Sequence, residues 1–262
     1  MRKLFIVCAA VCLLSACGIH VCQLSNPISE EWYADPEAVV YDGEYWIFPT
    51  LSQRFSKQTH FDAFSSRDLT TWTKHENILT QEGCCWIRRA LWAPAAINHN
   101  GRYYLFFSTN DVHEGEHGGI GVAVADKPEG PYVDAIGEPL IGAIINGAQP
   151  IDQCVFKDDD GTIYMYYGGW QHCNMCILND SLNGFIPFED GSTFKEVTPK
   201  SYVEGPFMLK RHGKYYFMWS EGKWHENDYK VAYAIADTPY GPFERKATIL
   251  ESDPEIDRKS VV

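Results

Sequence analysis

Four stretches of the chain share one pattern of polar and apolar positions. Each has a short polar turn that ends in glycine and then a run of aromatic and β-branched residues: YDGEYWIFPT, HNGRYYLFFSTN, DDGTIYMYYGG and RHGKYYFMWSEG. Asp-Gly and Asn-Gly pairs favour the type I′ turn of a β-hairpin, because both central residues need positive φ. The pattern therefore predicts four hairpins, with turn glycines at Gly43, Gly101, Gly161 and Gly213.

The runs after these turns are apolar on both faces, so the strands must be covered on both sides. Further strand candidates such as GIGVAVAD and KVAYAIAD follow the hairpins, and helical periodicity is nearly absent. Face-to-face sheets that recur every 50 to 60 residues or so indicate an all-β fold of the β-propeller type. A β-sandwich would explain the strands but not the period. The next turn glycine is expected near residue ~268, so we expect the last blade to be missing or incomplete in a chain that ends at Val262.

The N-terminus has the features of a secretion signal. A basic Met-Arg-Lys start precedes an apolar run from Leu4 to Leu14, which is too short to span a bilayer. The run ends in Leu-Ser-Ala-Cys, which resembles a bacterial lipobox with Cys17 as the lipidated residue. The alternative is an ordinary signal peptide with a chance cysteine. We expect a signal peptide over 1–17, a tether over 18–30 and one propeller domain over 31–262, held at the bacterial cell envelope by its lipid anchor.

Charge and composition narrow the class of partner. The formal charge is −13 without a Lys/Arg cluster, which argues against nucleic acid and anionic membranes. Aromatic residues make up 14% of the chain, which suits stacking on neutral sugars. The Cys173–Cys176 pair has CxxC spacing, but it follows a predicted strand, where the two positions face opposite ways. We therefore expect structural cysteines, and the spacing alone assigns no disulfide.

Acidic residues stand just upstream of three of the four hairpins: Asp35, Asp152 and Glu204. Equivalent positions on the innermost strands of a propeller converge on the central channel, so the three carboxyls are expected to occupy the same blade position and to face one another. Pro36 is expected to hold Asp35 in an extended conformation. Apolar neighbours raise the pKa of a carboxyl group, as a general acid requires. Each acid alone is as easily structural as catalytic; three in register favour catalysis.

The ordered motifs ADP (34–36), WAP (92–94), ID (151–152) and EGP (204–206) resemble the blade starts of glycoside hydrolase family 43. The resemblance covers residues 32 to 256 and implies a five-bladed propeller. It also implies inverting hydrolysis of arabinose- or xylose-containing glycans, of the α-L-arabinofuranosidase or β-xylosidase type. On that resemblance Asp35 is the general base, Glu204 is the general acid, and Asp152 modulates the pKa of the acid and holds its orientation.

Other residues are candidates for sugar binding. Trp92 and Trp219 are expected to wall the pocket, with blade packing as the alternative role. Arg89 and His172 are expected to hydrogen-bond sugar hydroxyls, and Glu221 is a second candidate acid. The resemblance implies no required cofactor. It allows a structural Ca²⁺ ion, whose usual His ligand lies in a segment that we expect this chain to lack, so no metal site is assigned. We expect a monomer.

Three competing hypotheses remain. The stretch HEGEH at 113–117 matches the HExxH zinc motif, but that motif needs a helix, and the glycines here predict a loop at the pocket rim. A non-catalytic, lectin-like propeller would fit the loss of a blade. A retaining furanosidase of the invertase type would start with Asn-Asp-Pro, whereas Ala34 precedes Asp35 here. The motifs leave open which pentose linkage is cleaved, and whether from the chain end or within it.

Overall fold

The computed structural model describes residues 27–252. The signal peptide, Cys17 and most of the tether lie outside the described residues. Blade 1 contains β1 (Tyr33–Tyr41), β2 (Glu44–Leu51), β3 (Phe61–Ser66) and β4 (Thr73–Leu79). Blade 2 contains β5 (Trp92–His99), β6 (Arg102–Thr109), β7 (Gly119–Ala125) and β8 (Val133–Asp134).

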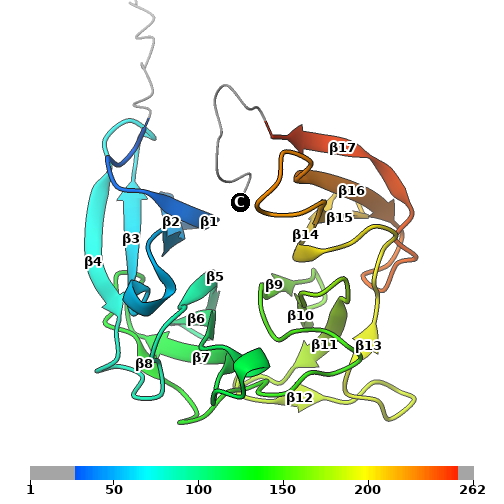
Figure 1. Ribbon diagram of the computed structural model, residues 1–262, viewed down its shortest axis with the longest axis horizontal. Helices are drawn as coiled ribbons and strands as arrows, with labels where there is room; N and C mark the ends of the chain where they lie inside the picture. Colours follow the sequence, from blue (N-terminus) through cyan, green and yellow to red (C-terminus); the bar gives the residue numbers. More distant parts are fainter. Residues whose placement is uncertain (1–26, 253–262) are drawn as a thin grey trace, which may run out of the picture.

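Blade 3 contains β9 (Cys154–Lys157), β10 (Ile163–Tyr167), β11 (Asn174–Leu178) and β12 (Phe185–Ile186), and β13 (Lys195–Glu196) also pairs with β11. Blade 4 contains β14 (Glu204–Arg211), β15 (Lys214–Glu221), β16 (Lys230–Ala236) and β17 (Arg245–Glu251). Each blade is an antiparallel meander, and β1, β5, β9 and β14 lie nearest the central axis (Figure 1). The predicted all-β propeller is confirmed, with four blades in the described residues.

The predicted hairpin turns follow from the local sequence in three of the four blades. Asp42-Gly43, Asn100-Gly101 and His212-Gly213 all have positive φ at both residues, as the type I′ turn requires. The third hairpin differs. β9 and β10 are joined by the five residues 158–162, in which the N–H of Gly161 donates to the carbonyl of Asp158 at 3.0 Å.

Three apolar clusters hold the blades together, one between each pair of consecutive blades. Trp46 and Leu105 belong to the cluster between blades 1 and 2, and Phe217 belongs to the cluster between blades 3 and 4. Cys173 lies in the cluster of blades 3 and 4, whereas Cys176 lies in that of blades 2 and 3. The predicted opposite orientation of the two thiols is therefore confirmed, and the strands are apolar on both faces because each face packs on a neighbouring blade.

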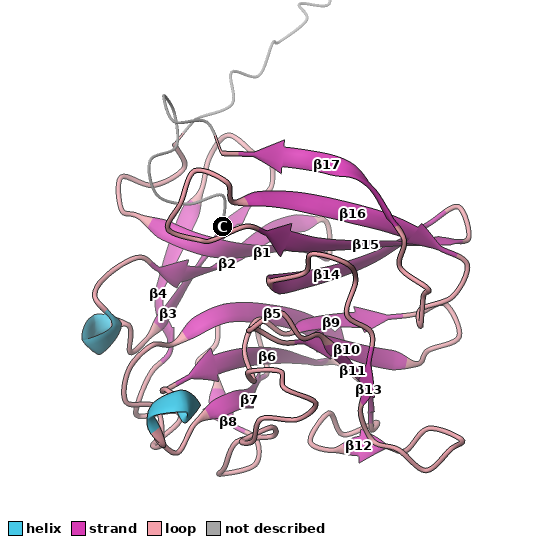
Figure 2. Ribbon diagram, turned by 45° about the vertical axis from the view of Figure 1, so that its right-hand side comes forward, coloured by secondary structure: helices cyan, strands magenta, loops and turns pink. Residues whose placement is uncertain are grey.

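One end of every blade carries both the start of its innermost strand and one connecting loop. Because neighbouring strands are antiparallel, the start of each innermost strand lies at the same end as the connection between its second and third strands. These connections are residues 52–60, 110–118, 168–173 and 222–229. The first two contain the 3-10 turns η1 (Phe55–Lys57) and η2 (Val112–Glu114), seen on one side of the molecule in Figure 2. We call this end the mouth.

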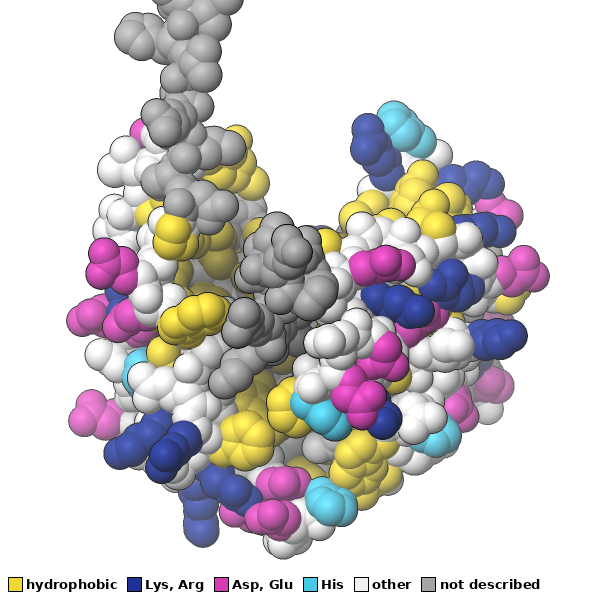
Figure 3. All heavy atoms as spheres, turned by 45° about the horizontal axis from the view of Figure 1, so that its top comes forward, with side chains coloured by type: hydrophobic (Ala, Val, Ile, Leu, Met, Phe, Trp, Pro, Cys, Tyr) yellow, Lys and Arg dark blue, Asp and Glu magenta, His cyan; other side chains and the backbone are white. Residues whose placement is uncertain are grey.

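The surface is mixed in charge. Figure 3 shows charged side chains of both signs over the outer parts of one face and apolar side chains nearer its middle. No helix in the described part of the chain is long and apolar enough to cross a bilayer.

Candidate active site

The innermost strands of blades 1, 2 and 4 begin with the same irregularity. Their pairing registers shift between Ala34 and Glu37, between Trp92 and Ala95, and between Glu204 and Phe207. Each shift is a β-bulge at an X-Pro step. The residues before the three prolines have positive φ: +46° at Asp35, +47° at Ala93 and +64° at Gly205. Asp152, just before β9, has a φ of +55°. A bulge bends the strand and re-aims the side chains next to it.

This geometry corrects two predictions. Asp35 is left-handed rather than extended, so the bulge overrides the usual effect of a following proline. Glu204 does not occupy the position of Asp35, because Glu204 pairs with Ser220 as Ala34 pairs with Thr50. The counterpart of Asp35 in blade 4 is Gly205. The acid of blade 4 is therefore placed one residue before the bulge, whereas the acid of blade 1 lies within the bulge. Asp152 of blade 3 precedes β9.

The three carboxyl groups nevertheless meet in one site. The backbone N–H of Gly205 donates to Oδ2 of Asp152 at 3.1 Å, which joins blade 4 to blade 3. Burial, and then the nearby charges of Glu204 and Asp35, raise the pKa of Asp152 well above its usual range. All three side chains are half-buried, so a substrate can reach them. Like charges at short range disfavour simultaneous ionisation, so the cluster retains protons above the usual range of carboxyl groups.

Asp35 is held between blades 1 and 2. Burial raises its pKa to about 6, and the charge of Glu204 adds to the rise. Hydrogen bonds from the Thr50 hydroxyl and from the backbone of Ala93 act in the opposite direction. Oγ1 of Thr50 also accepts from the N–H of Ala93 at 2.7 Å, so the bulge of blade 2 helps to fix the acid of blade 1.

Glu204 has a partner that the sequence did not suggest. The hydroxyl of the buried Tyr229 donates to Oε1 of Glu204 at 2.9 Å. Burial raises the pKa of Glu204, and this hydrogen bond opposes the rise. Tyr229 lies in connection 222–229, which no motif distinguishes from an ordinary loop, so its role was readable only from the structure.

Glu37 lies inside the molecule rather than on its surface. Its half-buried side chain has a pKa raised to about 8 by burial. Burial, and then the charge of Glu37, raise the pKa of Tyr41 and of Cys154 on blade 3. The carboxyls of Asp35 and Glu37 thus differ in surroundings although two residues separate them.

The two predicted tryptophans have different places. Trp92 is half-buried beside the bulge of blade 2, where its Nε1 donates to Oε1 of Gln58 at 2.6 Å and its ring meets Phe55 at 5.1 Å. Its contact with sugar stays a prediction. Trp219 has an exposed fraction of 0% and lies in the cluster between blades 3 and 4. Of its two predicted roles, the structure supports blade packing.

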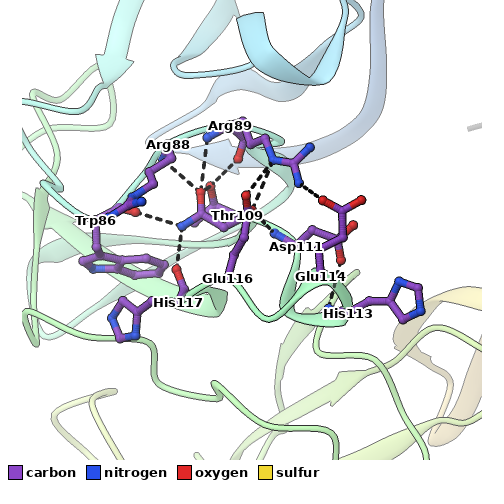
Figure 4. A network of polar contacts seen from close by, with 10 residues as sticks. Trp86, Arg88, Arg89, Thr109, Asp111, His113, Glu114, Glu116 and His117 are labelled. Carbon is purple, nitrogen blue, oxygen red and sulfur yellow. Dashed lines mark hydrogen bonds and ion pairs between the residues drawn. The ribbon is translucent and has the colours of Figure 1, made fainter.

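The polar candidates are paired with other side chains of the protein. Nε of Arg89 donates to both carboxylate oxygens of Glu116 at 3.0 and 3.1 Å, and its Nη2 donates to Glu114 at 2.6 Å (Figure 4). Arg89 therefore anchors the 110–118 connection. The buried Glu221 binds Arg245 through two contacts of 2.7 and 3.0 Å, and Nδ1 of His172 lies 2.9 Å from Glu196. None of these three pairings brings the residue to the acid cluster.

The HEGEH stretch forms a rim loop, as predicted. η2 is a single turn, and Gly115 ends it with a φ of +76°. The ring of His113 meets Trp170 at 5.1 Å, whereas the ring of His117 meets Trp86 at 6.0 Å, so the two histidines serve different partners. Within residues 27–252, no three His, Cys, Asp or Glu side chains are placed to hold one metal ion. The Ca²⁺ ion that the resemblance allows thus stays a prediction.

Comparison with known proteins identifies the family. The model described as "Glycosyl hydrolases family 43" matches residues 24–260. The chain belongs to this family. Its relatives include a β-D-galactofuranosidase of Aspergillus niger that is 46% identical over 236 residues, and the match covers 66% of that protein. The match covers 84% of this chain.

Two further relatives carry other names. A β-xylosidase of Xylanibacter ruminicola is 32% identical over 270 residues, with 84% of this chain and 80% of that protein covered. A solved family 43 β-xylosidase/α-arabinofuranosidase from a compost microbial metagenome, in complex with xylotriose, superimposes with a TM-score of 0.72 at 27% identity. That match covers 87% of this chain and 81% of the other.

Proposed function

We propose that the protein is an inverting glycoside hydrolase acting on arabinose- or xylose-containing glycans. The observation that carries the proposal is the convergence of three half-buried carboxyls, from blades 1, 3 and 4, on one site at the mouth. Membership of family 43 supports hydrolysis of a glycosidic bond as the reaction class. The mixed surface charge and the aromatic residues near the site support a neutral sugar.

Each carboxyl has a role in the proposed reaction. Asp35, with a pKa of about 6, is mostly ionised at pH 7 and accepts a proton from the attacking water. The water oxygen bonds to the anomeric carbon as the bond to the leaving oxygen breaks, and protonated Glu204 gives its proton to that oxygen. Burial raises the pKa of Glu204, and Asp152, whose own pKa is raised by burial and then by the charge of Glu204, is proposed as the modulator of that acid. Inverting enzymes separate base and acid by roughly 6.5–9.5 Å to leave room for the water.

The names of the relatives bear on which sugar the protein cleaves. The relatives bear the names of xylosidases, arabinosidases and a galactofuranosidase. A β-D-galactofuranoside is therefore a second candidate substrate, favoured by the 46% identity to the Aspergillus niger relative. The non-catalytic alternative is not favoured, because a lectin has no need of three converging acids. The retaining alternative stays open until the released anomer is known.

The decisive experiment is hydrolysis of 4-nitrophenyl α-L-arabinofuranoside, β-D-xyloside and β-D-galactofuranoside by this chain. We expect turnover of at least one, and its loss in Asp35→Asn and Glu204→Gln. Glu221→Gln is a matched control, because the carboxylate of Glu221 is bound by Arg245 away from the acids. No turnover by the wild type, or equal turnover by the two acid variants, would reject the proposal.

Two further expectations remain proposals. Large apolar side chains are exposed on the first and last blades, among them Val40, Phe207 and Leu250, and these support an additional blade that covers them. A chain extended by one blade should melt at a higher temperature than this one, and an equal melting temperature would contradict the expectation.

Lipidation at Cys17 in a bacterial envelope is tested by palmitate labelling, which should be lost in Cys17→Ser.

A further inference from the structure

Trp170 is an exposed indole at the mouth that the sequence did not single out. It lies in connection 168–173, at the same end of blade 3 as Asp152, and 40% of its surface is exposed. Exposed aromatic side chains also occur in two other mouth connections, at Phe55 and Trp224. Trp170 differs from these two because backbone hydrogen bonds tie its turn to the strands that carry the acids.

The turn that presents Trp170 is unfavourable for this residue. The N–H of His172 donates to the carbonyl of Gly169 at 3.2 Å, and the two central residues have φ of +55° at Trp170 and +69° at Gln171. Both values belong to the type I′ turn, which favours Asn-Gly. A bulky residue in this conformation costs stability, and such strain persists at functional sites where the surroundings hold it.

Two backbone hydrogen bonds place this turn against the acids. The N–H of Gly168 donates to the carbonyl of Ile151 at 3.0 Å, and the N–H of Gln171 donates to the carbonyl of Val203 at 3.1 Å. Ile151 and Val203 immediately precede Asp152 and Glu204 in the sequence. The turn that carries the indole is therefore fixed to the two strand starts from which the acids project.

The exposed ring is also supported from blade 2. The ring of His113 meets Trp170 edge-on, at 5.1 Å between centroids and 79° between planes. Figure 4 shows His113 on the loop that Arg89 anchors through Glu114 and Glu116. Oε2 of Glu116 also accepts from the N–H of Asp111 at 2.7 Å, which closes the loop on itself. Arg89 therefore contributes by positioning the loop that carries His113.

We propose that Trp170 is a stacking platform for a neutral sugar ring on the leaving-group side of the site. The side is assigned because its turn is bonded next to Glu204, the group that protonates the leaving oxygen, and so the inference rests on the proposed function. An indole face binds the C–H face of a sugar without charge, in keeping with the mixed surface. The platform selects substrates whose leaving group is itself a sugar, that is, oligosaccharides or polysaccharides.

Affinity electrophoresis tests the platform in gels that contain wheat arabinoxylan, sugar-beet arabinan or a galactofuranose-bearing galactomannan. We expect at least one polymer to retard the protein, with an affinity weakened roughly 2- to 12-fold in Trp170→Asn. Trp170→Phe should keep most of the retardation, because it keeps an aromatic face. Tyr240→Asn is the matched control: it removes a similarly exposed ring, 44% exposed, from connection 237–244 at the other end of the blades.

Folding and function are separated within the same experiment. Asn tolerates positive φ, so Trp170→Asn should melt at or above the temperature of the wild type, and weaker binding will not be due to unfolding. A wild type that no polymer retards, or a Trp170→Asn variant retarded as strongly as the wild type, overturns the inference. Retardation does not need turnover, so a protein that binds through Trp170 but hydrolyses nothing rejects the proposed function alone.

Discussion

The backbone N–H of Gly205 donates to Oδ2 of Asp152 across the boundary between blades 3 and 4. Gly205 has a φ of +64°, and a Cβ there would lie 3.2 Å from Oγ of Ser220. Gly205, which follows Glu204 in the sequence, thus donates a backbone hydrogen bond to the carboxylate of Asp152. Backbone N–H groups of bulge residues thus help to hold the carboxyl groups of the site in place.

Gly205→Ala should disturb this bond. An alanine at this φ costs about 1 kcal/mol of unfolding free energy, and relaxation of the bulge moves the N–H away from Asp152. We expect lower kcat/KM as well as a lower melting temperature. Gly213→Ala is the control, since Gly213 has a φ of +71° with open space around its Cβ position. Equal activity losses in the two variants would contradict a specific role for Gly205.

Asp35→Asn should remove activity without unfolding the protein. Asn tolerates the left-handed conformation of this position, and it removes a half-buried carboxyl whose pKa is raised to about 6. Loss of a general base lowers the rate by roughly 10²- to 10⁴-fold. The melting temperature at pH 7 should be unchanged or higher. Glu37→Gln, two residues away, should keep kcat/KM within a few-fold; an equally large loss there would contradict the assignment of Asp35.

Tyr229→Phe should shift the pH dependence of the reaction. The Tyr229 hydroxyl donates to the carboxylate form of Glu204, so its removal raises the pKa of Glu204 further. The alkaline limb of the kcat/KM profile should then move to higher pH, by up to about one unit. Tyr215→Phe, which removes a hydroxyl bound to Asp158 between blades 3 and 4, serves as the control. An unmoved limb in Tyr229→Phe would show that Glu204 does not set it.

Stability should fall as the pH rises through the range in which Glu37 titrates. Its folded-state pKa is raised to about 8, above about 4.3 in an unfolded chain. The folded state therefore binds more protons between these values, and the contribution of Glu37 is greatest below pH 4 and is lost towards pH 8. As the pH rises, the free energy of unfolding of the wild type should fall relative to that of Glu37→Gln by at most about 1.4 kcal/mol per pH unit, as measured by denaturant unfolding. If the free energies of unfolding of the two proteins changed in parallel with pH, the raised pKa of Glu37 would be contradicted.

The sequence predicted the blades and the acids well, because both follow from local patterns that repeat. Turn pairs such as Asp42-Gly43 mark hairpins by their backbone requirement, and strands that are apolar on both faces must pack between neighbours. The order of the blade starts then brought Asp35, Asp152 and Glu204 together. The repeat of acids before the hairpins, rather than any single residue, carried this part of the prediction.

The remainder depends on three-dimensional relations that no local pattern carries. A bulge shifts the pairing register by one residue, so the spacing of the hairpins along the sequence did not show that Glu204 and Asp35 are offset by one position. Arg89 looked free for substrate because its partners lie 25 and 27 residues away. Trp219 lies within an aromatic strand and Trp170 shortly after one, and only the packing shows that the first is buried and the second exposed.

The most direct test of the central claim is ¹H NMR of the sugar first released from the nitrophenyl glycoside that the chain hydrolyses fastest. With Asp35 as the base and Glu204 as the acid, water attacks from the face opposite the leaving group. The account therefore predicts that the anomer of inverted configuration appears first, with the other arising later by mutarotation. First appearance of the retained anomer would contradict it, because Asp35 would then act as a nucleophile.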